Sequence, residues 1–375
     1  MRKENAVLNL SHYLLLCRLD NWLRLLWRNR FAIEPKRLPQ ALLITLLSLL
    51  LSPFALIEAL ILHIPLRRGG VKKAPVYIVG HWRSGTTLLQ NILTRDPQFG
   101  FADPIGTLAV SNSFLLGFLL KRPMQKPLLE ARPMDNMRYS LDLPIEEVFG
   151  LATISPYAII HCVSFPKFFP KYLSSVFVCD MTAREKRSWQ RSYRYLLDKL
   201  SLRHGGRRLL LKSPDNTGHI SELLELYPDA RFISIHREPY VTLRSTLNMF
   251  QKQIELMRLS RMPDIDYEEE LENHFIWIFE RMYRMLFELE KRLPKNRFAD
   301  ISYEDFTAEP ELCLRRVYDA LELEGFEAAL PRMRAYIETQ KGYVKNQFSL
   351  SERLKRKINE RLGFYFEHYG YEMEQ

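Results

Sequence analysis

The sequence predicts an α/β protein with a P-loop-like parallel β-sheet flanked by helices and preceded by an N-terminal helical membrane-associating segment. Two observations lead to this prediction. After residue 73, short apolar runs alternate with longer helical patterns, which is typical of a parallel sheet, and a glycine-containing turn joins the first run to a helix. Before residue 74, the chain is apolar and basic. We therefore expect two parts, residues 1–73 and 74–375.

The positive charge is concentrated in the first part. The formal net charge is +10, and residues 1–73 contain twelve lysines and arginines against four acidic residues. A nucleic-acid-binding protein more often places such charge on its folded domain. Here the basic residues flank an apolar run, which favours anionic lipid as the partner and argues against nucleic acid.

The apolar run covers Ala41–Leu62, which is long enough to span a bilayer of about 30 Å hydrocarbon thickness. Pro53 and Glu58 interrupt it, and basic residues lie on both sides. We therefore expect a kinked, monotopic or re-entrant anchor, assisted by an amphipathic helix over residues 8–31. The alternative is a buried helical hairpin of a soluble protein.

The cysteines and the glycosylation sequon indicate the compartment. The four cysteines are scattered without a Cys-x-x-Cys pair, so neither a zinc site nor a disulfide framework is expected. The sequon at Asn9 precedes the apolar run, and residues 74–375 carry none. We expect a membrane-associated protein whose larger domain lies on the cytoplasmic face.

The first strand, Val76–Val79, leads through a glycine-containing turn into a helix expected over Thr86–Arg95. The spacing of the two glycines is that of a phosphate-binding loop, although a threonine stands where lysine is expected. Free N–H groups at a helix N-terminus favour anions. We expect a phosphate to contact this turn, at Arg83, Ser84, Gly85, Thr86 and Thr87. An ordinary strand-to-helix turn is the alternative.

This turn resembles the 5′-phosphosulfate loop of sulfotransferases that use 3′-phosphoadenosine 5′-phosphosulfate (PAPS), in which a basic residue precedes Ser-Gly-Thr-Thr. Residues 231–245 resemble the 3′-phosphate element of that family, which implies that Arg237 and Ser245 bind the 3′ phosphate. The resemblance covers residues 74–350 and implies the sulfotransferase fold, PAPS as donor and PAP as product. It also implies, more loosely, that Lys345 reaches the nucleotide; a solvated basic turn is the alternative.

Two glutamates are candidates for the general base. Residues 141–149 resemble a Pro-x-Glu-acidic segment of bacterial, lipid-associated sulfotransferases, in which a glutamate takes the acceptor proton. Glu146 is the first candidate and Glu147 the second. Acidic residues also favour helix N-termini, so a helix that begins at Pro144 would explain both without catalysis.

The remaining strands are expected at 208–212, 232–236 and 297–302, and long helices at 184–202 and 267–293. Lys212 ends the second strand and opens a turn-rich loop, which is where α/β sheets bind ligands. It is our candidate for stabilising the transferring sulfonyl group.

Together these features predict transfer of a sulfuryl group from PAPS to a hydroxyl or amine of a lipid, sterol or other amphiphile, without a metal. A P-loop kinase or NTPase is one alternative, although no lysine follows Gly85 and the Arg237–Ser245 pair would have no task there. A membrane-bound nucleotide-binding protein without catalysis is the other.

Overall fold

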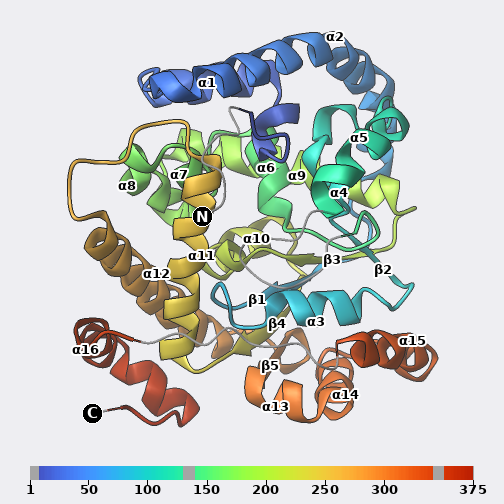
Figure 1. The fold of residues 1–375 in the computed structure, drawn as a ribbon. Helices are drawn as coiled ribbons and strands as arrows, with labels where there is room; N and C mark the ends of the chain where they lie inside the picture. The colour runs from blue at the N-terminus through green and yellow to red at the C-terminus, as the bar shows by residue number, and fades with distance from the viewer. Residues whose placement is uncertain (1–7, 130–139, 341–349, 375) are drawn as a thin grey trace. The chain divides into compact units, whose positions relative to one another are not determined.

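The computed structural model describes residues 8–129, 140–340 and 350–374 (Figure 1). The chain forms two compact units. The first contains Met1–Lys73, Gly100–Leu209 and Gln251–Pro263, and the second contains Ala74–Phe99, Leu210–Phe250 and Asp264–Gln375. The N-terminal segment therefore belongs to a larger helical unit, and the expected phosphate-binding turn belongs to the other.

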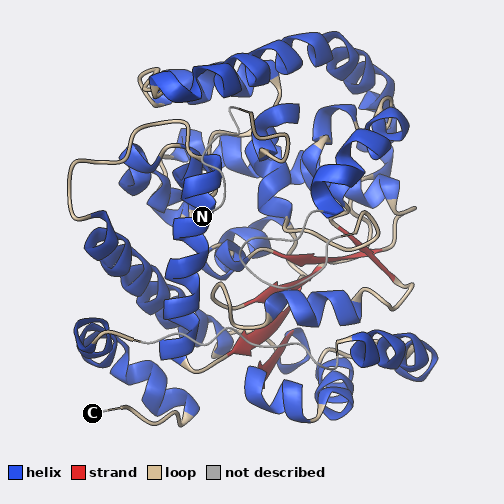
Figure 2. Cartoon of the chain, viewed as in Figure 1, coloured by secondary structure: helices blue, strands red, loops and turns tan. Residues whose placement is uncertain are grey.

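Five strands, red in Figure 2, form one sheet in the order β2-β3-β1-β4-β5. The strands are β1 (Val76–Val79), β2 (Phe99–Phe101), β3 (Arg208–Lys212), β4 (Arg231–His236) and β5 (Phe298–Ser302). β1 is parallel to β3 and β4, and β4 is parallel to β5. The predicted α/β fold is confirmed. Because these strands are parallel, their carboxyl ends lie at one edge of the sheet.

Several bounds differ from the prediction by one to three residues, and three differences concern the site. β2 was not expected, since a three-residue strand with a central glycine gives little periodic signal. The helix that follows β1 begins at Thr86 as expected, but it ends at Leu93 and not at Arg95. The helix expected at Pro144 begins at Glu147, with Glu146 as its N-cap residue.

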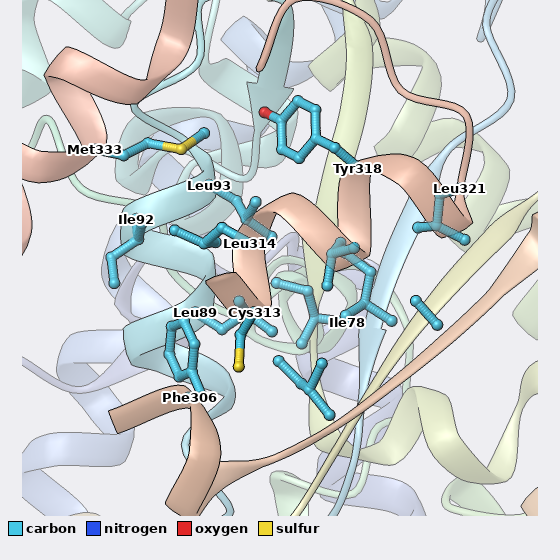
Figure 3. Close-up of a cluster of buried hydrophobic side chains, with 14 of the residues drawn as sticks. Ile78, Leu89, Ile92, Leu93, Phe306, Cys313, Leu314, Tyr318, Leu321 and Met333 are labelled. Carbon is cyan, nitrogen blue, oxygen red and sulfur yellow. The ribbon is translucent and has the colours of Figure 1, made fainter. Parts of the chain in front are cut away.

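In the second unit, helices cover the sheet. They are α3 (Thr86–Leu93), η7 (Pro214–Gly218), α10 (Ile220–Leu226), α11 (Pro239–Met257, which continues into the first unit), α12 (Tyr267–Glu290), η8 (Lys295–Arg297), α13 (Tyr303–Ala308), α14 (Pro310–Ala320), α15 (Phe326–Thr339) and α16 (Glu352–Tyr369). Figure 3 shows the core between α3, α13, α14, α15 and the sheet, with Ile78, Leu89 and Leu314 in contact. The Tyr318 hydroxyl in this core donates to Asp96 at 2.6 Å, so its burial leaves no unpaired polar group.

The described part of the first unit is helical apart from strand ends. Its elements are η1 (Tyr13–Leu16), α1 (Leu19–Arg28), η2 (Pro35–Arg37), α2 (Leu38–Gly69), α4 (Pro104–Leu108), η3 (Val110–Asn112), α5 (Gly117–Leu129), α6 (Glu147–Ile154), α7 (His161–Ser164), η4 (Pro166–Phe168), α8 (Phe169–Tyr172), η5 (Leu173–Ser175), η6 (Val178–Asp180) and α9 (Ala183–Arg203). A capping box formed by Thr182 and Glu185 starts α9.

Buried hydrogen bonds fix the N-terminal segment to the rest of the first unit. The Tyr13 hydroxyl lies 3.1 Å from His161 Nδ1 and 2.9 Å from Ser164 Oγ, and all three side chains are buried. Burial lowers the pKa of His161 to about 4, so its imidazole is neutral at pH 7. This Tyr-His-Ser group resembles a nucleophilic arrangement in composition, but its complete burial makes it a packing element.

The apolar run lies within α2, the one described helix that is long and apolar enough to cross a membrane. Only 17% of the residues in its most apolar window are buried within the protein. Most of its large apolar side chains are exposed, including Leu42 (66%) and Leu60 (69%), which does not fit a buried hairpin.

Candidate functional site

The turn between β1 and α3 depends on an unusual backbone. Gly80, Arg83 and Gly85 all have positive φ, at 140°, 69° and 101°. A Cβ on Gly80 would lie 2.4 Å from the carbonyl oxygen of Ile235, and a Cβ on Gly85 would lie 2.3 Å from the ring of Tyr303. Both positions therefore require glycine on conformational and on steric grounds. The predicted loop spacing thus has a structural cause.

Hydrogen bonds within the second unit hold the start of this turn. The Gly80 N–H donates to the Thr217 hydroxyl at 2.8 Å, and that hydroxyl donates back to the Gly80 carbonyl at 3.1 Å. Ser84 is buried, and its hydroxyl donates to the carbonyl of His81 at 2.8 Å. The turn is therefore preorganised by protein contacts, and Thr86 and Thr87 begin α3, where the first N–H groups lack intrahelical partners.

The two elements assigned to the 5′ and 3′ phosphates lie in direct contact. Arg83 Nε donates to Ser245 Oγ at 2.9 Å, and Arg237 Nη1 donates to the carbonyl oxygen of Arg83 at 3.1 Å. Ser245 lies on α11, and Arg237 directly follows β4. Two guanidinium groups and a hydroxyl from three separate segments therefore converge beside the N-terminus of α3. This arrangement favours binding of anionic groups.

Aromatic side chains position Arg237. Its guanidinium carbon lies 4.2 Å from the ring centroid of Tyr303, a cation–π distance. The Tyr365 hydroxyl of α16 donates to the Arg237 carbonyl at 2.8 Å and lies 3.2 Å from the Arg237 N–H, which donates to it. Since Tyr303 also packs against Gly85, one ring contacts both phosphate elements.

Lys212 lies at the same edge of the sheet. Its side chain is 2% exposed, and Nζ donates to the Thr87 hydroxyl at 3.1 Å. In register, Lys212 stands opposite Ile78 of β1, so its side chain is on the same face of the sheet as α3. The structure thus brings together Lys212 and the other described residues predicted to contact the donor. Lys345 lies outside the described residues.

His81 and Trp82, which the sequence analysis passed over, form the buried floor of the turn. His81 Nδ1 lies 3.1 Å from the Trp82 carbonyl oxygen, and the imidazole packs against Phe279 of α12 with ring centroids 4.7 Å apart. Burial lowers the pKa of His81 to about 3, so the ring is neutral at pH 7 and adds no charge to the site. Its function is to support the backbone.

Tyr303, Tyr365 and Thr217 were also not predicted to belong to the site. The rule that parallel strands place their carboxyl ends at one edge would have found Tyr303, because it directly follows β5. Tyr365 gives no such signal, because it lies mid-helix and reaches Arg237 only through the tertiary fold.

Both candidate bases lie in the first unit, at the start of α6. Glu146 is the half-buried N-cap residue, and its side chain makes no capping hydrogen bond. Glu147 is fully buried, and its Oε1 accepts a hydrogen bond from the Tyr193 hydroxyl at 3.4 Å. The N–H of Ile145 donates to the Ala102 carbonyl at 2.9 Å and fixes the chain before the helix. Burial therefore distinguishes the two glutamates, since only Glu146 retains exposed surface.

Comparison with known proteins agrees with this geometry. The sequence profile of the Sulfotransferase family matches residues 75–328. The omega-hydroxy-beta-dihydromenaquinone-9 sulfotransferases Stf3 of Mycobacterium bovis and Mycobacterium tuberculosis are 32% identical to this chain over 362 residues, which cover 95% of this chain and 90% of each relative.

Solved structures show the same fold. The sulfotransferase STF9 from Mycobacterium avium superimposes with a TM-score of 0.67 at 19% identity, covering 95% of this chain and 97% of that one. The sulfotransferase STF1 from Mycobacterium tuberculosis H37Rv gives a TM-score of 0.64 at 17% identity, covering 91% and 92% of the two chains.

Proposed function

Because this chain belongs to the sulfotransferase family, we propose that it transfers a sulfuryl group from PAPS to a hydroxyl or amine of an amphiphilic acceptor. The observation that carries the proposal is the contact of Arg83 with Ser245 and of Arg237 with the Arg83 backbone. These contacts join, beside one helix N-terminus, the two elements that the family resemblance assigns to the two phosphates of the donor.

The donor is held by the second unit in this proposal. The α3 N-terminus, Arg83 and the hydroxyls of Thr86 and Thr87 bind the 5′ phosphosulfate, and Arg237 with Ser245 binds the 3′ phosphate. Ser84, predicted to contact the same phosphate, supports the turn through the hydrogen bond of its buried hydroxyl to the His81 carbonyl. The preorganised turn supports these assignments, because an anion replaces few existing contacts of the backbone N–H groups there.

The reaction is an in-line displacement at sulfur. The acceptor oxygen or nitrogen forms a bond to sulfur as the bond between sulfur and the 5′-phosphate oxygen breaks, and PAP leaves. Glu146 takes the acceptor proton, with Glu147 as the second candidate. Lys212 stabilises negative charge on the sulfonyl group and on the departing oxygen. The contact of Lys212 with Thr87 supports this role, since it keeps the ammonium beside the phosphosulfate turn.

We infer the class of acceptor from the relatives and from α2. The mycobacterial relatives are named for an omega-hydroxy-dihydromenaquinone acceptor. The exposed apolar helix supports a protein that meets its acceptor at a membrane. The scattered cysteines and the absence of a sequon from residues 74–375 favour placing that domain on the cytoplasmic face. A lipid, sterol or similar amphiphile that carries a hydroxyl or amine is therefore the proposed acceptor class.

A screen with sulfur-labelled PAPS tests the proposal. The purified full chain is incubated with labelled PAPS and a membrane lipid extract, and labelled products are identified by mass. We expect label in an organic-soluble product that is absent without protein and reduced with Arg237→Ala. A parallel reaction contains ATP in place of PAPS. Phosphorylated products in that reaction, with no sulfated product from PAPS, would contradict the proposal.

A further inference from the structure

Between Gln40 and Leu62, helix α2 turns several polar residues toward the protein and most of its large apolar residues outward. Its buried residues include Gln40, Ser48 and Glu58, whereas Leu42, Leu49 and Leu56 are 66%, 56% and 64% exposed. These three leucines are seven residues apart, so they lie on one face of the helix. This is the reverse of a surface helix of a soluble domain.

The contacts of α2 run along its whole length. Near its start, Gln40 Oε1 accepts from the Asn9 N–H at 2.6 Å, and the Trp22 indole donates to Thr45 Oγ1 at 2.8 Å. After its end, the Val71 N–H donates to Asp198 of α9 at 3.0 Å. The helix is about 48 Å long at 1.5 Å per residue. One face of the whole helix is therefore fixed to the first unit.

Glu58, in the second half of α2, also faces the protein. Its carboxylate pairs with Lys199 and accepts from the N–H groups of Phe114 and Leu115 at 3.0 and 2.7 Å. Both charged side chains are buried. A spanning orientation would carry this ion pair, with the helices that supply its partners, into hydrocarbon, at a cost of several kcal/mol for each desolvated ion. The apolar length of α2 is thus no argument for spanning.

Neighbouring elements of the first unit extend the apolar surface. Phe118 and Leu119 of α5 are 86% and 66% exposed, only three and four residues beyond the backbone that Glu58 binds, and Trp27 of α1 is 76% exposed. Figure 1 shows α1 leading into α2, with α5 near the C-terminal half of α2. We call the outward faces of α1, α2 and α5 the apolar surface.

The charges beside this surface identify its partner. Every exposed charged residue within 19–73 and 114–124 is lysine or arginine, including Lys36, Arg67, Arg68, Lys121 and Arg122. The acidic residues there are not free, because Asp20 pairs with Arg18 and Arg24, Glu34 with Arg258, and Glu58 with Lys199. A broad apolar face with an entirely basic border matches an anionic lipid leaflet.

We propose that the first unit docks on an anionic lipid leaflet through the apolar surface, with α2 lying in the plane of the membrane and not crossing it. This inference rests on the membrane association proposed above and specifies its partner and geometry. The acceptor then reaches the protein from within one leaflet. Glu58 and Lys199 keep the polar face of α2 on the protein side.

Depth measurements along α2 test the geometry. Fluorescent labels are attached in the full chain at Leu42→Cys, Leu49→Cys or Leu56→Cys, each combined with Cys179→Ser because the other three cysteines are buried. The chain is mixed with phosphatidylcholine vesicles with or without phosphatidylglycerol, and quenching by lipids brominated at different depths is measured. An in-plane helix gives one shallow depth at all three positions, whereas a spanning helix separates successive labels by about 10 Å.

A surface variant and a matched control complete the test. Phe118→Ser with Leu119→Ser should weaken binding to phosphatidylglycerol vesicles at least about tenfold, because two apolar side chains no longer leave water. The control Leu312→Ser removes an exposed leucine of α14 in the second unit and should leave binding unchanged. Removing phosphatidylglycerol should weaken binding of all forms.

Three outcomes would overturn the proposal. They are label depths that differ by about 10 Å, vesicle binding that is insensitive to the surface variant, and unquenched labels in a stable dimer, which would make the surface an interface between two copies. The assays contain neither PAPS nor acceptor, so their failure leaves the sulfotransferase proposal intact. Conversely, a protein that binds vesicles in this way and transfers no sulfate would refute only the proposed reaction.

Discussion

The turn between β1 and α3 in the second unit and helix α2 in the first unit differ in which side chains bond within the protein. In the turn, the Gly80 N–H and the Ser84 hydroxyl bond within the protein, and the Arg83 guanidinium donates to Ser245. In α2, Gln40, Ser48 and Glu58 face the protein, whereas most of the large apolar side chains are exposed. The proposed partners differ accordingly: a nucleotide phosphate beside the cationic groups of the turn, and lipid at the exposed apolar side chains of α2.

The proposed general base gives the largest expected effect. If Glu146 removes the acceptor proton, Glu146→Gln keeps the shape but loses the basic oxygen, and turnover should fall by about 10²–10⁴-fold. PAP affinity should remain unchanged, because in the proposed mechanism Glu146 contacts the acceptor and not the donor phosphates. Turnover and PAP binding are measured for this variant and for Glu147→Gln, which should be milder if Glu147 only supports α6. Near-normal turnover in Glu146→Gln would exclude it as the base.

Removing the buried Glu58 carboxylate from the protein-facing side of α2 should destabilise the first unit. Glu58→Ala leaves the Lys199 ammonium buried without its carboxylate and removes the acceptor of two backbone N–H groups, so we expect a loss of about 3–5 kcal/mol. Denaturant unfolding measures it. The double variant Glu58→Gln with Lys199→Met should recover much of the loss, since the buried charge is gone. If the single variant were as stable as the native chain, the inward orientation of Glu58 would be wrong.

Substitutions in the proposed donor site should instead change PAP affinity more than they change the stability of the fold. Arg237→Ala removes a charged hydrogen-bond donor and should weaken PAP binding by about 10- to 100-fold. Tyr303→Leu, which removes the ring beneath that guanidinium and beside Gly85, should weaken it by a smaller factor of about 2 to 30, the usual strength of a cation–π contact. Tyr303→Phe keeps the ring and should bind PAP normally. Equal loss in the Leu and Phe variants would show that the ring does not position Arg237.

Acid should lower the free energy of unfolding of both units over the same pH range. Burial lowers the pKa values of His12, His161 and His236 to about 4 and that of His81 to about 3, against an ordinary 6.5. Below pH 6.5 the unfolded chain takes up protons that the folded chain does not, so stability present above pH 6.5 is lost as the pH falls toward 4.

Asp300 in the second unit acts against this trend. Burial raises the pKa of Asp300 to about 7, so the folded chain favours its neutral carboxyl group. The stability that this group contributes at low pH is lost as the pH rises toward 7. Asp300→Asn should therefore steepen the acid loss between pH 4 and 6.5 by about 1.4 kcal/mol per pH unit. Denaturant midpoints measured across this range provide the test, and native stability that is flat from pH 6.5 to 4 would contradict the assignment of neutral buried histidines.

The sequence was sufficient for the turn because its constraints are local. Gly80 and Gly85 are recognisable since their backbone angles and the close neighbours of their Cα atoms exclude other residues. Arg237 and Ser245 could be proposed as ligands of the 3′ phosphate because residues 231–245 resemble a family element, and the structure places Arg237 directly after β4 and Ser245 on α11. The support from Tyr303 and Tyr365 could not be predicted, because it arises where distant segments pack.

For α2 the sequence was sufficient for length and hydropathy but not for orientation. From the sequence alone, Glu58 adds a free-energy cost to inserting the apolar run into lipid. The fold instead pairs Glu58 with Lys199, which is far away in sequence. A hydropathy run cannot show which face of a helix the protein covers. The same limit applied to the glutamate pair, since burial of Glu147 depends on Tyr193 of α9.

Direct titration of PAP and ATP into the full chain, with heat or thermal stability as the signal, is the sharpest test of the central claim that the turn at residues 80–87 and the Arg237–Ser245 element together form a site for both phosphates of the donor. We predict that PAP binds and stabilises the protein, that ATP does so far more weakly because it lacks a 3′ phosphate, and that Arg237→Ala reduces this difference. Equal binding of PAP and ATP by the native chain would contradict the claim and favour a nucleoside-triphosphate enzyme.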